Sequence, residues 1–203
     1  MSVVIGYFLP MSGKRTNAAE ETAKRLQQLH AAGKLPVPAQ ESVQFVALDR
    51  RDADVDAFIS TARSAGATKV LILGETLGPL RIETIAYDRA PPPQSVLLSA
   101  LTGLARQGKG GALTTPAPVE EMARAAGVAL SADAGTDYCN RVFYRALQAG
   151  LPAVFVHVNS GFLEHFRDIG GSAAGVAAML GAWFRSTPSV AAHARGVAAS
   201  FGR

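Results

Sequence analysis

Three short runs of apolar, β-branched residues alternate with two stretches of helical periodicity in the first part of the chain. The runs are Ser2–Phe8, Ser42–Leu48 and Thr68–Leu73, and their length and composition are typical of buried strands. Such an alternation of strand and helix predicts an open α/β sheet with helices on both faces. In sheets of this kind, ligands bind at the carboxyl ends of the strands. A ligand-binding or catalytic site is therefore expected among the residues that follow each strand.

The starts of the two intervening helices are marked in the sequence. Asn17 and Glu20 form a capping-box pair before a helix that we expect from Ala18 to about Ala32. Asp52 or Asp54 is expected to cap the second helix, because short carboxylate side chains accept hydrogen bonds from the first free N–H groups.

The middle of the chain is less regular. Gly74–Asp88 is predicted to be an irregular loop, with room for a short strand at Ile85–Ala86. Arg89–Gln94 contains three consecutive prolines and is predicted to be loop as well. Ser95–Gly111 favours a helix over Val96–Ala105, followed by a mobile glycine-rich segment.

Regular periodicity returns in the second half. The predicted elements are a helix over Val119–Ala126, a strand over Val128–Ala132, a helix starting near Cys139, a strand over Ala153–Val158, and three helices near Phe162–Phe166, over Ser172–Phe184 and after Thr187.

The composition bounds the class of protein. A chain of 203 residues that is 48% hydrophobic, with mean hydropathy +0.16, is long enough for one core, so residues 1–203 are predicted to form one domain. A single cysteine cannot form an internal disulfide, and no signal peptide is evident at the N-terminus. No apolar run reaches the roughly 18 residues of a membrane span. These features predict a cytoplasmic protein without a membrane partner.

The distribution of charged residues does not favour a nucleic-acid partner. The net charge of +4 comes from 20 basic and 16 acidic residues spread along the chain, without a dense Lys/Arg block. A mildly basic, solvated surface is the ordinary explanation for such a pattern. The sequence leaves the oligomeric state open, and a homo-oligomer is compatible with it.

The only cysteine, Cys139, lies at the predicted start of a helix. Free N–H groups and the positive end of the helix dipole can lower a thiol pKa from about 8.5 toward neutrality. A lone cysteine is more often a small buried hydrophobe than a nucleophile. Its place at a helix start, and the histidine described next, reverse that estimate, so the sequence predicts a reactive thiolate.

His157 lies near the end of the strand that follows this helix, 18 positions after Cys139. A helix of about 11 residues covers ~16 Å and a six-residue strand covers ~20 Å. A strand that returns antiparallel to the helix therefore brings His157 back beside Cys139. A thiol beside an imidazole is the minimal nucleophilic pair, although His157 could instead be a satisfied core histidine.

Three segments together resemble pyroglutamyl peptidase I (pyrrolidone-carboxylate peptidase), a family of cysteine peptidases. They are V-V-I-G-Y-F-L-P-M-S-G-K-R-T-N from residue 3, L-I-L-G-E-T-L-G-P-L-R-I-E-T-I-A-Y-D from residue 71, and A-G-T-D-Y-C-N-R-V-F-Y from residue 134, which F-V-H-V follows. The resemblance implies a single-domain, three-layer α/β/α sandwich with a mostly parallel mixed sheet, similar to phosphorylase/hydrolase folds. It also implies that Cys139 is the nucleophile, His157 the general base and acid, and Glu83 the residue that orients His157. From its residues alone, Glu83 could equally be a solvated surface group.

The same resemblance places four side chains at the substrate pocket: Phe8, Met11, Glu75 and Tyr138. Met11 replaces a phenylalanine of the family, and Glu75 replaces a glutamine. Backbone N–H groups around Tyr138 and Cys139 are implied to stabilise the oxyanion, with Arg89 as a candidate helper. No metal or organic cofactor is implied. The altered residues leave the hydrolytic machinery intact and change the pocket.

These implications lead to one expected function and two alternatives. The expected function is removal of an N-terminal pyroglutamyl (5-oxoprolyl) residue from a small peptide with a blocked N-terminus, through an acyl-enzyme on Cys139. The first alternative is an amidase or peptidase on the same scaffold that takes a different N-blocked substrate. The second is a non-catalytic relative that binds a small ligand.

Overall fold

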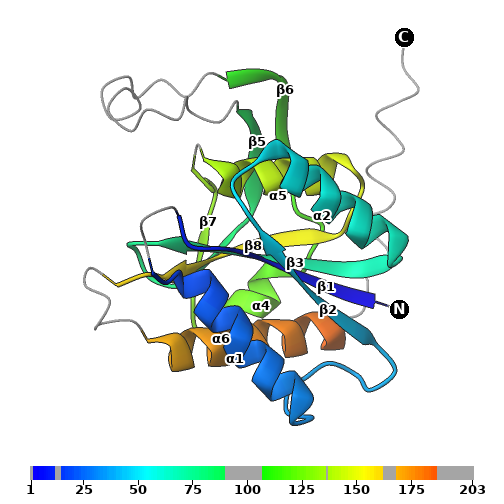
Figure 1. Cartoon of the computed structure of the whole chain (residues 1–203), viewed down its shortest axis with the longest axis vertical. Coiled ribbons are helices and arrows are strands. Elements are labelled where there is room, and N and C mark those ends of the chain that lie inside the picture. Colours follow the sequence, from blue (N-terminus) through cyan, green and yellow to red (C-terminus); the bar gives the residue numbers. More distant parts are fainter. Residues whose placement is uncertain (1, 12–14, 90–106, 136, 162–167, 187–203) are drawn as a thin grey trace.

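A computed structural model describes residues 2–11, 15–89, 107–135, 137–161 and 168–186, to which all structural statements refer (Figure 1). The elements in chain order are β1 (Ser2–Phe8), α1 (Ala18–Ala31), β2 (Ser42–Leu48), α2 (Asp52–Ser64), β3 (Ala67–Thr76), β4 (Arg81–Glu83), β5 (Ile85–Arg89), β6 (Gln107–Thr114), α4 (Val119–Ala126), β7 (Ala129–Ser131), α5 (Tyr138–Gln148), β8 (Ala153–Asn159) and α6 (Ile169–Arg185).

A six-stranded mixed sheet forms the middle layer, in the order β2-β1-β3-β8-β4-β7. Strands β2, β1, β3 and β8 are parallel to one another, whereas β4 pairs antiparallel with β8 and parallel with β7. Helices α1, α4 and α6 cover one face, and α2 and α5 cover the other (Figure 1). The predicted three-layer α/β/α sandwich with a mostly parallel mixed sheet is confirmed. The extent of one domain over residues 1–203 stays a prediction.

The side chains of β3 show how the two faces are built. Leu71 and Leu73 lie in the core beneath α1 and α6, and Val70 and Ile72 lie in the core beneath α5 and α2. Because side chains alternate along a strand, the next position, Gly74, belongs to the α5 face. Glu75 then belongs to the α1 face. This alternation decides which residues can meet at the end of β3.

Most predicted elements in the described residues are confirmed, and the differences lie at their ends and between β3 and α4. Gly74–Asp88 is not an irregular loop: β3 runs on to Thr76, because its last residues pair with β8 as far as Asn159, and β4 and β5 follow. The glycine-rich segment up to Gly111 belongs to β6, which pairs antiparallel with β5. Pairing with distant strands overrides the weak local preference of these residues.

Two predicted helix caps also differ. Neither Asp52 nor Asp54 caps α2: the N-cap residue is Arg51, and its Nε atom lies 2.7 Å from Asp54 Oδ2. At α1, Asn17 Oδ1 accepts a hydrogen bond from the Ala19 N–H at 2.8 Å, as expected for a cap. Glu20 instead forms an ion pair with Lys24. The predicted helices over Val96–Ala105, near Phe162–Phe166 and after Thr187 lie outside the described residues.

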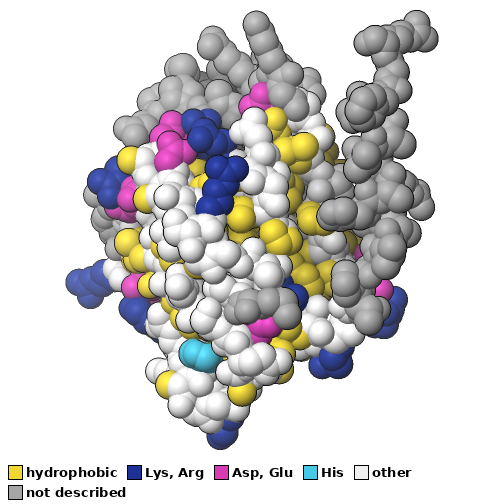
Figure 2. Space-filling view, turned by 90° about the vertical axis from the view of Figure 1, so that its right-hand side faces the viewer, with side chains coloured by type: hydrophobic (Ala, Val, Ile, Leu, Met, Phe, Trp, Pro, Cys, Tyr) yellow, Lys and Arg dark blue, Asp and Glu magenta, His cyan; other side chains and the backbone are white. Residues whose placement is uncertain are grey.

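The surface seen in Figure 2 is mixed in character. Hydrophobic side chains form a patch near the middle of this face, and Lys, Arg, Asp and Glu side chains are scattered around it. Among the described helices, none combines the length and the apolar character needed to cross a membrane.

Candidate active site

The end of β8 carries His157 at the carboxyl edge of the sheet. In the pairing of β3 with β8, His157 lies opposite Gly74. The imidazole packs against Phe155, two residues earlier on the same face, with ring centroids 4.9 Å apart and an interplanar angle of 66°. His157 is therefore a buried side chain on the α5 face of the sheet.

A carboxylate holds one nitrogen of this ring. Glu83 Oε1 lies 2.7 Å from His157 Nδ1, and the Glu83 side chain is fully buried. Because a carboxylate can only accept, the Nδ1 atom carries the proton and donates it to Glu83. The Nε2 atom of the neutral ring is then left as the proton acceptor. The structure thus brings together Glu83 and His157, two of the three residues predicted to form the catalytic triad.

Arg81 is a member of this group that the sequence analysis missed. Its Nε atom donates to Glu83 Oε1 at 2.8 Å, and it lies opposite His157 in the pairing of β4 with β8. An Arg-X-Glu pattern puts both side chains on one face of a strand. The loop predicted for Gly74–Asp88 conceals this strand pattern.

Opposing effects act on the Glu83 carboxyl. Burial raises its pKa, but hydrogen bonds from His157, Ser131 and Arg81 lower it, and the net result is a pKa below the ordinary value of 4.5. Glu83 is therefore ionised in the folded protein at neutral pH.

This lowered pKa predicts an acid-labile contribution to stability. The contribution is fully present above the unfolded value of 4.5 and is lost as pH falls through the folded pKa, because the unfolded chain then binds more protons. In Glu83→Gln, the free energy of unfolding should decrease less between pH 6 and pH 3 than in the wild type. Urea unfolding at both pH values measures the free energy of unfolding, and Glu121→Gln, at an exposed position, is the control. Identical decreases in Glu83→Gln and the wild type would contradict it.

Cys139 is the second residue of α5, close to its predicted position. Its side chain is half-buried and packs against the core between α5 and the sheet. A Cβ atom added to Gly74 would lie 2.9 Å from Cys139 Sγ and 2.6 Å from Phe155 Cζ. The thiol and the imidazole therefore lie on the same face of the sheet, over neighbouring strands. A direct hydrogen bond between them stays a prediction.

The predicted low thiol pKa is wrong. Surrounding protein atoms exclude water from most of the sulfur, and this burial raises the pKa of Cys139 to about 12, with a further increase from the negative charges of Asp137 and Glu75. Arg50 acts in the opposite direction. The helix-start argument considered only the free N–H groups, whereas desolvation of the thiolate is the larger effect here.

The raised pKa predicts slow alkylation of the unliganded protein. Iodoacetamide should modify Cys139 slowly at pH 6 and faster as pH rises, because only the thiolate reacts. Asp137→Asn should increase the rate at pH 8 by about 2–10-fold, since it removes a negative charge near the sulfur. Intact-mass spectrometry measures both rates, with the distant Asp56→Asn as control. Rapid labelling at pH 6 would contradict this prediction.

Arg50, in the loop after β2, is a second residue that the sequence analysis missed. It donates from Nη1 to the Leu9 carbonyl at 3.1 Å, and its guanidinium lies 5.4 Å from the centre of the Phe8 ring. Its Nε atom is 3.9 Å from Asp137 Oδ2. No motif marks Arg50 in the sequence. It nevertheless joins the end of β1 to the start of α5 beside the thiol.

The remaining predicted pocket residues occupy different environments. Phe8 is fully buried at the end of β1, Met11 is 42% exposed, and Tyr138 is half-buried at the first position of α5. Their contact with a substrate stays a prediction. Arg89 ends β5, but its side chain lies outside the described part of the chain.

Glu75 has a structural environment of its own. Its Oε2 atom accepts a hydrogen bond from the Ala18 N–H at 3.0 Å, at the positive end of α1. This contact is on the face of the sheet opposite Cys139. The carboxylate is therefore directed away from the thiol, toward the helix start that it stabilises.

This placement predicts that Glu75→Gln is tolerated. A glutamine side chain keeps an oxygen that can accept from Ala18, while it removes a negative charge that raises the Cys139 pKa. Turnover of the pyroglutamyl substrate that the sequence resemblance implies should be equal to that of the wild type or up to about 3-fold higher, with stability reduced by at most ~1 kcal/mol. Glu75→Leu, which cannot accept, is the comparison for the helix contact. A large loss of turnover in Glu75→Gln would instead place this carboxylate in substrate binding.

Asn140 fixes the residues around the thiol. Its buried side chain accepts from the Tyr87 N–H and donates to the Tyr87 carbonyl, both at 2.8 Å. The residue next to Cys139 thus ties the start of α5 to β5. The sequence places Asn140 next to Cys139 but does not reveal this pairing, because the pairing depends on where β5 lies.

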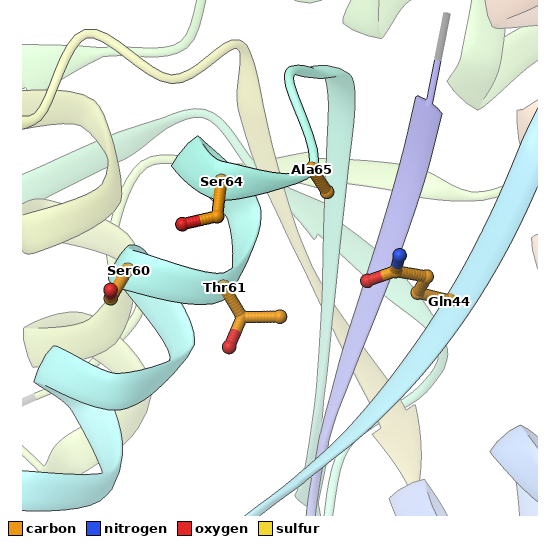
Figure 3. A pocket seen from close by; sticks show the side chains of 5 residues that line it. All are labelled: Gln44, Ser60, Thr61, Ser64 and Ala65. Carbon is orange, nitrogen blue, oxygen red and sulfur yellow. The ribbon is translucent and has the colours of Figure 1, made fainter.

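Two surface cavities in the described part of the chain lie away from these residues. One, of about 360 Å³, is lined by Gln44 of β2 and by Ser60, Thr61, Ser64 and Ala65 at the end of α2 (Figure 3). The other, of about 460 Å³, lies between α4 and α6. Within the described residues, no group of three or more His, Cys, Asp or Glu side chains is arranged to hold a metal ion.

Comparison of the sequence with protein-family models and with curated proteins finds no match. Several solved structures are similar in fold. A pyrrolidone carboxyl peptidase from Thermococcus litoralis has a TM-score of 0.69 at 17% identity, over 90% of this chain and 93% of that one. A mutant pyrrolidone carboxyl peptidase from Pyrococcus furiosus has a TM-score of 0.68 at 15% identity, over 91% and 98%. Pyroglutamyl peptidase I of Bacillus amyloliquefaciens has a TM-score of 0.68 at 14% identity, over 90% and 96%. This likeness confirms the fold that the sequence resemblance implied.

Proposed function

We propose that the protein is a cysteine hydrolase that removes an N-terminal 5-oxoprolyl residue from small peptides. The observation that carries the proposal is the buried Glu83–His157 pair, which lies at the carboxyl edge of the sheet on the same face as the only cysteine. A nucleophile, a base and a residue that orients the base are the minimal set for acyl transfer. The names of the similar structures support the choice of substrate.

In the proposed reaction, Cys139 Sγ attacks the carbon of the peptide carbonyl that joins the 5-oxoprolyl group to the rest of the peptide, and the C–N bond to the departing amine breaks. His157 Nε2 takes the thiol proton during the attack and delivers it to the departing peptide amine. Because the unliganded thiol has a raised pKa, the nucleophile is formed by this transfer and is not a standing thiolate. Glu83 keeps the ring in the required tautomer and stabilises the imidazolium.

The start of α5 contributes to the same step. Tyr138 and Cys139 belong to the first turn of α5, where backbone N–H groups lack an intrahelical partner and can stabilise the oxyanion of the tetrahedral intermediate. Water then attacks the acyl-enzyme with His157 as base and releases 5-oxoproline. The reaction requires a reduced cysteine, so the proposal includes a reducing, cytosolic setting.

The test is a direct assay of the purified protein on pyroglutamyl-7-amido-4-methylcoumarin. Prolyl, glutamyl and N-acetyl amides of the same fluorophore are the matched controls, since they lack the lactam ring. We expect release of fluorophore from the pyroglutamyl amide at least ~10²-fold faster than from the control amides. A site that forms hydrogen bonds with the lactam would keep buried groups unpaired when a control amide binds. The proposed substrate would be rejected if the pyroglutamyl amide is not hydrolysed, or if it is hydrolysed no faster than the control amides.

One observation favours a second candidate. Asp137 is 53% exposed beside the thiol, and the Arg50 guanidinium lies next to it. A pocket with a carboxylate and a guanidinium at its edge could accept a charged N-blocked amide in place of the neutral lactam. Hydrolysis of such an amide, with loss of activity in Asp137→Asn, would support this amidase. Binding of 5-oxoproline without any turnover would instead support a ligand-binding protein.

A further inference from the structure

One oxygen atom of the site accepts two cationic or potentially cationic donors. Glu83 Oε1 is 2.8 Å from Arg81 Nε and 2.7 Å from His157 Nδ1. Glu83 is fully buried, and the His157 and Arg81 side chains are 7% and 24% exposed. Hydrogen bonds at such a buried site are strong and little screened by water. Arg81 therefore affects how strongly the Glu83 carboxylate interacts with His157, and the reverse also holds.

We propose that Arg81 is a positioning residue that holds the Glu83 carboxylate and limits how strongly this carboxylate stabilises the protonated His157 ring. With two donors on one oxygen, part of the negative charge of Glu83 is directed at the guanidinium. The positive charge of Arg81 also disfavours a second positive charge on the imidazole next to it. The ring can then release its proton to the leaving amine more readily than in an isolated carboxylate–imidazole pair.

The turn before β4 is shaped for this arrangement. A Cβ atom on Gly78 would lie 2.7 Å from Arg81 Nη1, so with a side chain at this position the flexible end of Arg81 would have to shift. Gly78 therefore permits the close approach of Arg81 to the turn while its Nε atom contacts Glu83. A substitution at Gly78 offers a route to displace the guanidinium without changing Arg81 itself.

Other charged or titratable groups lie on the elements packed around the site, and in the described residues none of them contacts Glu83 Oε1 as Arg81 does, so they act less directly. In the described residues they are Cys139 and Asp137 at the start of α5, Arg50 after β2, Glu75 on the far face of β3, and Tyr87 and Asp88 on β5. Of the cations, Arg81 contacts the carboxylate itself. Its contribution to the protonation of His157 should therefore be separable from theirs by single substitutions.

The experiment follows the His157 ring proton by NMR as pH is changed, with the signal identified by its loss in His157→Asn. In Arg81→Gln, the ring should gain its proton at a pH ~0.5–1 unit higher than in the wild type, because a positive charge has been removed. Arg81→Lys keeps the charge and should lie within about 0.2 unit of the wild type. Gly78→Val, which forces the end of the Arg81 side chain to shift, should change the titration in the same direction and by less than Arg81→Gln.

Lys69→Gln is the matched control, because it removes one positive charge at the other end of β3, over the Trp183 and Phe184 rings. It should leave the His157 titration unchanged. The inference is overturned if Arg81→Gln titrates like the wild type, or if Arg81→Lys shifts as far as Arg81→Gln, which would indicate a purely structural role. Should Arg81→Gln fail to fold, Arg81→Met, which also removes the positive charge, is titrated in its place.

The inference rests on the proposed function only for its kinetic consequence. If the pyroglutamyl amide is a substrate, the acid limb of the kcat/KM profile should move upward in Arg81→Gln by the shift seen in the ring titration. The NMR measurement needs no substrate. Failure of the proposed function would leave the titration result standing, and failure of the inference would leave the hydrolysis assay unaffected.

Discussion

Cys139→Ala is expected to lower kcat/KM for the pyroglutamyl amide by at least ~10³-fold, because no other group in the proposed mechanism can form the acyl intermediate. The chain contains no second cysteine that could take over. Loss of a small, half-buried side chain should leave the fold intact, so the melting temperature should change by only a few degrees. The rate is measured by fluorophore release and the fold by circular dichroism.

The control for this variant is Met122→Leu, which removes a fully buried sulfur from α4, on the opposite face of the sheet. It should keep nearly all activity. Cys139→Ser tests the nucleophile more finely, since a hydroxyl of similar size is far less acidic than a thiol. Substantial turnover by Cys139→Ala would remove the cysteine mechanism and leave the Glu83–His157 pair to be explained by another chemistry.

Gly74→Ala is expected to damage both stability and activity. The added Cβ would meet Phe155 Cζ at 2.6 Å and Cys139 Sγ at 2.9 Å, and Phe155 is fully buried and packed against Phe143 with ring centroids 6.0 Å apart. Because the ring has no free space to move into, we expect a loss of about 1–3 kcal/mol in the free energy of unfolding. Displacement of the thiol should lower kcat/KM by about 10–100-fold, since misplacement of a reacting atom is costly.

Gly170→Ala, in the first turn of α6, is the matched control, because the nearest atom to its added Cβ is Asp168 Oδ1 at an ordinary 3.7 Å. It should be neutral or stabilising, as expected for alanine in a helix. Urea unfolding gives the stabilities, and the hydrolysis assay gives the rates. If Gly74→Ala keeps the wild-type rate and stability, then Cys139 Sγ and Phe155 do not pack against β3 in the way described.

Several features of the site were predictable because they depend on local sequence. The periodicity of residues 2–73 predicts the alternation of strands and helices, and β1 and β2 have the expected bounds. The turn residues before Cys139 predict that it lies at the start of a helix, which is α5. The apolar run before His157 predicts that it lies near the end of a strand, which is β8. These are short-range signals, which the tertiary structure has no reason to override.

The interactions that set the chemistry were not predictable in this way. The strand conformation of Arg81–Glu83 depends on its pairing with β8 and β7, so the contacts of Glu83 with Arg81 and His157 exist only once distant strands have met. The side of the sheet to which Glu75 points depends on how far β3 continues beyond Leu73.

The sequence by itself determined the α/β class, most of the elements and the two chain positions, 139 and 157, on which the proposed chemistry rests. The tertiary structure alone decided the protonation of Cys139 and of Glu83. The thiol pKa of about 12 results from the protein atoms that surround Cys139, and the ionised state of Glu83 results from donors on three strands. Strand and helix patterns are local properties of the chain, whereas desolvation and charge pairing are sums over everything that folding brings near an atom.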